Sequence, residues 1–140
     1  AVIGPVTVTF WATSSAPDTD FTAKLVDVHP DGFAQNVLNR VIRARFRNGS
    51  KSPPALVEPG RAYEYEIDLG YTSNVFRKGH QIRLDISSSE FPHLARNHNT
   101  GEHPASDKRF EIATQIIHHD EDHPSYVDLS VVPQLGKGPR

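Results

Sequence analysis

The sequence of 140 residues contains no cysteine and no methionine. The absence of cysteine excludes a disulfide framework and any thiolate chemistry. No apolar run reaches the roughly 18 residues that a membrane-spanning helix needs, and no basic segment followed by an apolar one opens the sequence. We therefore expect no membrane partner and a cytoplasmic location, although a secreted protein fits the same composition.

Excess charge of one sign is also missing, because 15 basic residues face 17 acidic ones and the formal net charge is −2. This balance predicts no electrostatic attraction to nucleic acid. The first position holds alanine rather than methionine, and a strand-like pattern begins soon after it. These features predict a piece of a longer protein, with a single domain over residues 1–135 and a frayed tail over residues 136–140.

Alternation of apolar and polar residues is the main pattern that is present. In residues 6–13 one face is apolar, and the other face carries threonines and Trp11. Related runs predict further strands over residues 21–28, 41–47, 62–69, 80–88, 111–118 and 125–132, with a connecting piece at 72–76 and a loop or bulge at 36–39. About eight short strands without a helix predict an all-β fold, and we expect a jelly-roll β-sandwich of the galactose-binding-domain-like kind.

Two of these runs carry charges of opposite sign on their polar faces. In residues 41–47 the polar face carries three arginines at alternate positions. In residues 62–69 apolar residues alternate with Glu64, Glu66 and Asp68. Opposite charges on antiparallel neighbours stabilise a sheet by about 0.2–1 kcal/mol per pair. The pattern predicts that the two strands pair or nearly pair, with Arg45 and Glu66 on the same face of the molecule.

Residues 14–32 form the most distinctive stretch and indicate a turn, a strand and a second turn. Asp18 and Asp20 follow Pro17 in the first turn, and Asp31 and Gly32 make the second. Aspartate and glycine favour such bends, so we expect these residues to shape turns. Asp18 and Asp20 could also contact Ca²⁺ through carboxylate oxygens, but a turn is the preferred interpretation. A long polar loop over residues 89–107 is of the kind that is usually functional or docked on something.

Catalytic and metal-binding motifs are weak. No G-x-S-x-G elbow is present, and Ser87, Ser88 and Ser89 end a strand without the sharp glycine turn that exposes an activated hydroxyl. Residues 118–123 are rich in histidine and carboxylates, but a turn gives such ligands no fixed geometry. We therefore expect no catalytic residue, no metal site and no cofactor in this chain.

Trp11 stands out because it interrupts a face lined by threonines. Exposed aromatic side chains mark interaction surfaces, so Trp11 is either covered by an edge loop of the same domain or available to a partner. A carbohydrate- or ligand-binding module is the alternative function on this basis, with stacking from Trp11, Tyr63, Tyr65 and Tyr71. Tyr63 and Tyr65, however, fall on the face that the alternation assigns to the core.

Three long motifs resemble one family, in the same order along the chain. They are SSAPDTDFTAKLVDVHPDG at residues 14–32, TSNVFRKGHQIRLDISSSEFPHLARNHNTG at 72–101 and HPSYVDLSVVP at 123–133. With Glu58-Pro59-Gly60 between the first two, they resemble the carboxy-terminal domain of cocaine-esterase-like and X-Pro dipeptidyl-peptidase-like serine hydrolases. The likeness runs from about Ile3 to Pro133. It departs from the family where Asn39-Arg40 replaces a second Asp-Gly, which puts that local turn in doubt.

The resemblance implies a non-catalytic domain of an esterase, acylase or dipeptidyl-peptidase. In this family a serine–histidine–aspartate triad lies in an α/β-hydrolase domain, which is the partner that the resemblance implies for this chain. The domain would pack on that partner and help wall its substrate cleft, and its exposed interface could make the fragment a homo-oligomer. The first strand can approach the acyl pocket in the family, so Phe10 and Trp11 are interdomain or cleft candidates. Further candidates in the long loop are Phe91, Asn97 and Asn99. A small self-contained hydrolase is a third hypothesis.

Overall fold

The computed structural model describes residues 1–103 and 105–133, and its regular secondary structure is almost entirely strand. The predicted all-β fold is confirmed, and the described residues form seven strands where about eight were expected. The predicted tail at 136–140 lies outside the described residues, and none of the described segments is a helix that could span a membrane. The elements are β1 (Val2–Ser14), β2 (Asp20–Val28), β3 (Ala34–Arg43), the 3-10 helix η1 (Ala44–Phe46), β4 (Tyr63–Asn74), β5 (Gln81–Ser87), β6 (Gln115–His118) and β7 (Tyr126–Val131).

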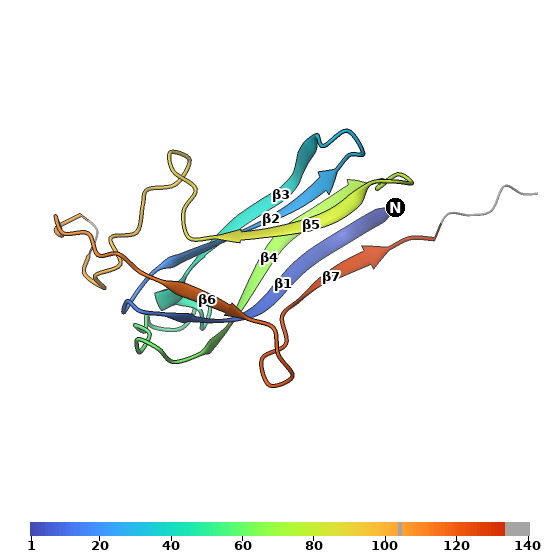
Figure 1. Cartoon of the computed structure of the whole chain (residues 1–140). Helices are drawn as coiled ribbons and strands as arrows, with labels where there is room; N and C mark the ends of the chain where they lie inside the picture. Colours follow the sequence, from blue (N-terminus) through green and yellow to red (C-terminus); the bar gives the residue numbers. More distant parts are fainter. Residues whose placement is uncertain (104, 134–140) are drawn as a thin grey trace, which may run out of the picture.

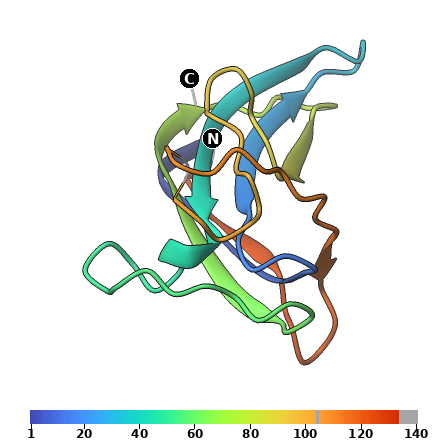
Figure 2. The ribbon, with the colours of Figure 1, turned by 90° about the vertical axis from the view of Figure 1, so that its left-hand side faces the viewer.

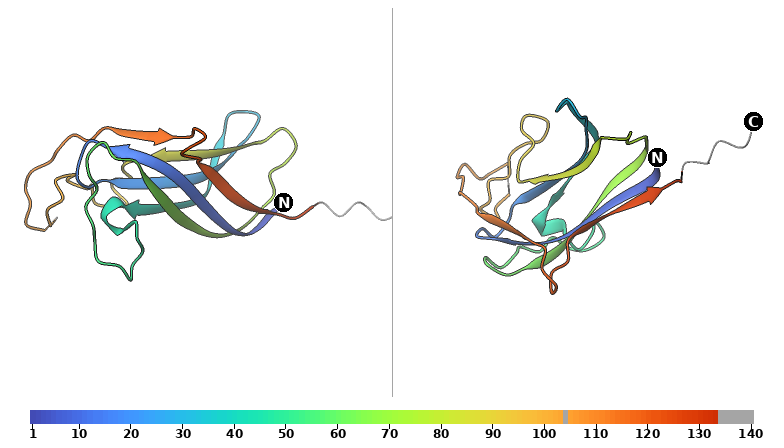
Figure 3. Two further views of the ribbon diagram at one scale, coloured as in Figure 1. Left: turned by 90° about the horizontal axis from the view of Figure 1, so that it is seen from below. Right: turned by 45° about the vertical axis from the view of Figure 1, so that its right-hand side comes forward.

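The strands form two antiparallel sheets that face each other as a sandwich (Figures 1 and 3). In the larger sheet β1 pairs with β4 along one edge, while β7 and β6 share the other edge. The smaller sheet has the order β3-β2-β5. β1 is therefore the strand around which the larger sheet is organised, and β2 has the same role in the smaller sheet.

The core lies between the sheets and follows the alternation of β1. Its predicted inward residues are at most 1% exposed: Val6, Val8, Phe10 and Ala12. The ring of Phe10 lies 5.4 Å from that of Tyr65 on β4 and 5.3 Å from that of Phe21 on β2. Aromatic pairs at such distances stabilise a core beyond their buried area. This aromatic cluster joins the two sheets.

The predicted direct pairing of residues 41–47 with residues 62–69 is wrong, although β3 and β4 lie close together, so the weaker expectation that they nearly pair is confirmed. Residues 41–43 end β3, which belongs to the smaller sheet, and residues 44–46 form η1, whereas β4 pairs with β1 in the larger sheet. Arg45 binds the carboxylate of Asp18, and Glu66 lies opposite Thr9. The buried carboxylate of Asp18 binds Arg45 more strongly than the exposed carboxylates of β4 could, because a charge-assisted hydrogen bond is strongest where water is excluded.

Residues 36–39 were expected to be a loop or bulge, and they belong to β3. The register with β2 shifts here, since Leu38 lies opposite Leu25 and Asn36 lies opposite Val26. The bulge is therefore confirmed and the loop is not. The strand predicted over residues 111–118 is shorter in the structure. β6 begins at Gln115, and residues 111–114 are irregular.

Burial of Tyr65 gives the first testable prediction. Desolvation raises the pKa of the Tyr65 hydroxyl to about 12, above the value of about 10 for an exposed tyrosine. The folded protein therefore holds this proton more tightly, so stability is complete below about pH 10 and falls as pH rises toward 12. We expect a loss of about 1–2 kcal/mol over that range, because solvent screens part of the effect. Alkaline urea titrations should show this loss in the wild type and a much smaller one in Tyr65→Phe; equal losses would contradict the assignment.

Candidate functional site

A cluster of buried charges joins the first turn of the chain to the end of β3. The Asp18 side chain is wholly buried, and its carboxylate accepts hydrogen bonds from the backbone N–H of Arg45 at 3.0 Å and from Arg45 Nε at 2.8 Å. Asp20 accepts two bonds from the guanidinium of Arg43, at 2.8 and 3.1 Å. A two-point pair of this kind fixes geometry as well as charge. The contact with Asp20 raises the pKa of Arg43 further above its usual range.

Asn97 completes this cluster from a distant part of the sequence. Its Nδ2 donates to Asp18 at 3.0 Å and to Asp20 at 2.8 Å, so one amide bridges both carboxylates. We call Asp18, Asp20, Arg43, Arg45 and Asn97 the carboxylate clamp. Asp18 and Asp20 were expected to shape a turn; Asp20 begins β2, and the recorded contacts of both carboxylates are with the other members of the clamp, which anchors a loop.

The anchored segment is the β5–β6 loop, residues 88–114, whose described residues contain no strand or helix. Asn99 has a positive φ of 62° and donates from Nδ2 to the carbonyl of Glu111 at 2.8 Å. Its backbone N–H donates to Oδ1 of Asn97 at 2.9 Å. Asn97 and Asn99 therefore hold the loop in place, and their amides are engaged within the domain.

Several large apolar side chains of the anchored loop and of β6 are exposed, among exposed charged residues such as Arg96, Lys108 and Glu111. Figure 2 looks onto the end of the sandwich where the loop runs, and Figure 1 shows that the N-terminus lies at the other end. Ile112 is 98% exposed, which is extreme for an isoleucine in a loop fixed by hydrogen bonds. We call the exposed apolar residues of this end the end surface: Phe91, Phe110, Ile112 and Ile116.

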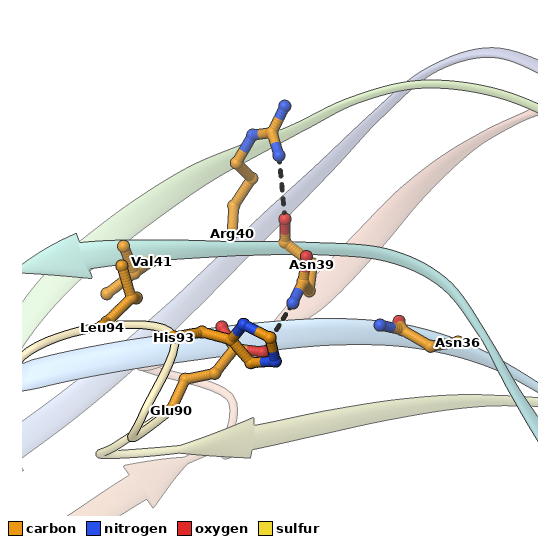
Figure 4. A pocket seen from close by; sticks show the side chains of 7 residues that line it. All are labelled: Asn36, Asn39, Arg40, Val41, Glu90, His93 and Leu94. Atoms are coloured by element: carbon orange, nitrogen blue, oxygen red, sulfur yellow. Dashed lines mark hydrogen bonds between the residues drawn. The ribbon is translucent and has the colours of Figure 1, made fainter.

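A pocket of about 470 Å³ lies beside the end surface, between β3 and the start of the loop (Figure 4). Glu90 Oε1 lies 2.6 Å from Asn39 Nδ2 and 3.0 Å from Lys24 Nζ, and the hydrogen bond from Lys24 lowers the pKa of Glu90. His93 and Leu94 line the pocket from the loop. The loop is thus fixed to the smaller sheet at its start as well as by the clamp.

Phe10 and Trp11 are neighbours on β1 with different surroundings. Phe10 is fully buried in the core, so its side chain cannot contact another domain or a substrate. Trp11 is partly buried, and its ring lies 5.1 Å from that of His123 in the turn between β6 and β7. Ser125 fixes this turn, since its hydroxyl accepts from the Trp11 N–H and donates to the His118 carbonyl. An edge loop of the same domain therefore covers part of Trp11.

The candidate nucleophiles and the histidine-rich turn form no catalytic arrangement among the described residues. The Ser87 hydroxyl lies 2.6 Å from that of Thr22, and the Ser88 hydroxyl donates to Gln115 at 3.4 Å. His123 binds the carboxylate of Asp120 at 3.0 Å, which lowers the pKa of Asp120. A serine nucleophile needs an adjacent base, and the recorded partners of these serines are hydroxyl, amide and carbonyl groups.

The aromatic residues considered for sugar binding do not form one platform. Tyr65 is in the core, and the guanidinium of Arg47 lies over the ring of Tyr63 at 4.3 Å. Tyr71 is 78% exposed, but it lies about 26 Å along β4 from Tyr63 at the usual rise of a strand. Asp31 and Gly32 shape the β2–β3 turn, in which Asp31 accepts a hydrogen bond from the N–H of Phe33 and Gly32 has a φ of 90°.

Sequence reasoning missed the roles of Arg43, Arg45 and Glu90. The position of Asp18 and Asp20 next to a buried strand was an available signal, because a buried carboxylate needs a cationic or N–H partner. Arg43 and Arg45, at alternate positions of the next strand-like run, could have been proposed as the partners of these carboxylates. The partner Asn97 is 79 residues away from Asp18, and no local pattern links them.

Comparison with known proteins agrees with the family resemblance seen in the sequence. The family described as "X-Pro dipeptidyl-peptidase C-terminal non-catalytic domain" matches residues 1–128. Cocaine esterase of Rhodococcus sp. (strain MB1 Bresler) is 44% identical over 133 residues, which cover 94% of this chain and 23% of that protein. The chain therefore spans about a quarter of the length of this curated relative.

Two solved structures of hydrolytic enzymes contain a domain with the same fold. An α-amino acid ester hydrolase has a TM-score of 0.82 and 25% identity, covering 93% of this chain and 24% of its own. An aminopeptidase from the marine sediment archaeon Thaumarchaeota archaeon has a TM-score of 0.85 and 26% identity, covering 94% of this chain and 23% of its own. The chain belongs to the family of X-Pro dipeptidyl-peptidase C-terminal non-catalytic domains, which cocaine-esterase-like hydrolases of the CocE/NonD type contain.

Proposed function

We propose that this domain packs on an α/β-hydrolase catalytic domain of the same parent chain and helps wall its substrate cleft. The observation that carries the proposal is the end surface, where exposed apolar side chains belong to β6 and to a loop that hydrogen bonds and buried charges hold in place. The domain itself contributes no catalytic group. In this proposal the parent hydrolyses an ester or a peptide bond with a serine nucleophile, which the likeness to cocaine esterase and to serine esterases supports.

The end surface suits such packing because its conformation is already fixed. Burial of apolar area stabilises an interface by about 25 cal/mol per Å², and a rigid loop loses little conformational entropy when a partner covers it. Ile112 and Phe110 have most of their area in water in this chain, so both gain from coverage. Without the partner, the same surface would favour self-association of the isolated domain.

Trp11 is the candidate for the cleft wall. It lies on the half of β1 that pairs with β6, and β6 follows directly after the β5–β6 loop. The part of its ring that His123 leaves uncovered can contact a substrate held between two domains. Phe10, the other candidate on β1, is buried and therefore supports the position of Trp11 from the core.

Replacing Ile112 with aspartate tests the packing. We expect little change in the melting temperature of the 140-residue chain, since the side chain is 98% exposed. In the longer parent chain the substitution should uncouple the domains, lower the melting temperature and reduce activity, because a carboxylate buried without a partner is costly. Differential scanning calorimetry and ester hydrolysis of the parent are the measurements.

Val131→Asp is the matched control, because Val131 is an apolar residue of similar shape, 67% exposed, at the opposite end of the sandwich. It should leave coupling and activity unchanged. If both variants behave alike in the parent chain, or if neither has an effect, the end surface is not the interdomain contact.

A further inference from the structure

Two turns meet at the end of the sandwich opposite the carboxylate clamp (Figure 1). β2 ends at Val28 and β5 begins at Gln81, and these two residues are cross-strand partners. His29 and His80 are the next residues outward on each strand, so the register brings them side by side. Asp27 is two residues before His29, which places both on one side of the extended chain. The pairing of β2 with β5 thus gathers one carboxylate and two imidazoles.

The three side chains are close together and poorly accessible. Asp27 is 3% exposed, and its Oδ1 lies 2.8 Å from Nδ1 of His80. The rings of His29 and His80 have their centroids 4.3 Å apart. One ligand atom from each of the three residues lies within 4.8 Å of the other two. Small rotations of these side chains would bring the three atoms to the distances that a tetrahedral zinc ion requires, about 2.0–2.2 Å from the metal.

The backbone holds both turns in place. The N–H of Gly32 donates to the carbonyl of His29 at 2.9 Å, and the N–H of His80 donates to the carbonyl of Arg77 at 3.0 Å. Gly79 has a φ of 88°, and a Cβ at this position would lie 3.4 Å from Pro30 of the other turn. The two turns therefore pack closely, and the positions of His29 and His80 follow from this packing.

A second observation concerns the pocket beside these residues, whose volume is about 370 Å³. Asn74, at the end of β4, lines this pocket together with Asp27 and His80, and its buried Nδ2 has no hydrogen-bond partner. The nitrogen and oxygen of an asparagine amide exchange places by a half turn. That half turn would put Oδ1, an oxygen ligand, where the unpartnered nitrogen lies.

We propose that Asp27, His29 and His80 form a binding site for a divalent transition-metal ion of the Zn²⁺ type. Two imidazole nitrogens and one carboxylate favour zinc over calcium or magnesium, which prefer oxygen ligands. The fourth position is open to water or to the Asn74 amide. Arg77 also lines the pocket, but its side chain is exposed and can direct its charge into water. The ion would tie the β2–β3 turn to the β4–β5 turn and stabilise this end of the domain.

The site differs from the histidine-rich turn at residues 118–123, which supplies a matched control. Zn²⁺ should be titrated into the 140-residue protein by calorimetry, with the histidine ring signals followed by NMR. We expect one ion per chain, changes at the rings of His29 and His80, and a rise in melting temperature with added Zn²⁺. His29→Ala should weaken binding at least about tenfold while leaving the hydrogen bond between Asp27 and His80 intact.

His123→Ala removes a histidine from the other cluster and should leave Zn²⁺ affinity unchanged. The proposal is overturned if His29→Ala binds Zn²⁺ as the wild type does, or if the ring signals that change belong to His118, His119 and His123. Since His29→Ala keeps the buried pair of Asp27 and His80, the result does not depend on whether His80→Ala folds.

Discussion

Replacing Asp18 with alanine is expected to lower the free energy of unfolding by about 3–5 kcal/mol, the usual cost of removing one partner of a buried ion pair. The Asp18 side chain is wholly buried, and that of Arg45 is only 16% exposed. Without Asp18 the guanidinium of Arg45 would keep a single bond, to the carbonyl of Glu102, and the Arg45 backbone N–H would lose its acceptor. For a domain of this size the loss corresponds to a fall in melting temperature of about 10–15 °C.

Asp31→Ala is the control for that result. Asp31 is also a turn aspartate whose carboxylate accepts a backbone N–H, but the contact is exposed. An exposed hydrogen bond of this kind is worth about 1 kcal/mol. Thermal unfolding of both variants should therefore give a much larger loss for Asp18→Ala. Equal losses would show that the carboxylate clamp contributes no more than an ordinary turn.

Hydrogen exchange provides a second measurement on Asp18→Ala. Asn97 would lose one of its two carboxylate acceptors, so we expect faster exchange across the β5–β6 loop than across the strands of the core. Unchanged protection of that loop would mean that Asp20 alone anchors it.

Phe10→Ala is the second substitution with a large expected effect, about 3–5 kcal/mol. Its ring is fully buried against Phe21 and Tyr65, so truncation leaves a cavity at the centre of the core. Trp11→Ala removes a larger side chain, but only part of that side chain is covered, and we expect a loss of about 1–2 kcal/mol. Urea unfolding of the two variants measures the difference between adjacent positions of one strand.

The same pair separates stability from the proposed role at the cleft. In the longer parent chain, Trp11→Ala should alter kcat/KM for the substrate at temperatures where the protein is fully folded. Phe10→Ala should change activity only as far as it unfolds the domain. If Trp11→Ala destabilises this chain as much as Phe10→Ala does and leaves the parent's kcat/KM unchanged, Trp11 is an ordinary core residue.

Much of the fold could be predicted from local patterns. The alternation in β1 and β4 placed Phe10 and Tyr65 correctly in the core, because a half-buried strand repeats every two residues. Asp31 and Gly32 were placed correctly in a turn for an equally local reason. The pairing of strands could not be derived in this way. A row of arginines and a row of carboxylates are compatible with many arrangements. In the structure Arg43 and Arg45 bind aspartates at or just before the start of β2, and Arg47 binds backbone carbonyls.

The candidate site was harder to predict for the same reason. Asn97 and Asn99 were named from the family resemblance, and the structure shows their amides binding inside the domain. Phe10 was named as a cleft candidate because the first strand can approach the acyl pocket in the family, although the alternation of that strand already assigned it to the core and adjacent residues of a strand point to opposite faces. Ile112, the most exposed apolar side chain of the end surface, carries no sequence motif that marks it.

The position of β1 has a consequence for synthesis on the ribosome. β1 is the first strand to emerge, and its β4 edge can be paired once about half of the chain has followed. Its other edge stays unpaired until β6 and β7, the last of the described strands, have been made, because Val2 pairs with Val131 and Thr9 with Tyr126. Until then the nascent domain presents an unpaired edge, which is a template for aggregation. The larger sheet is therefore complete only after β7 has emerged from the ribosome.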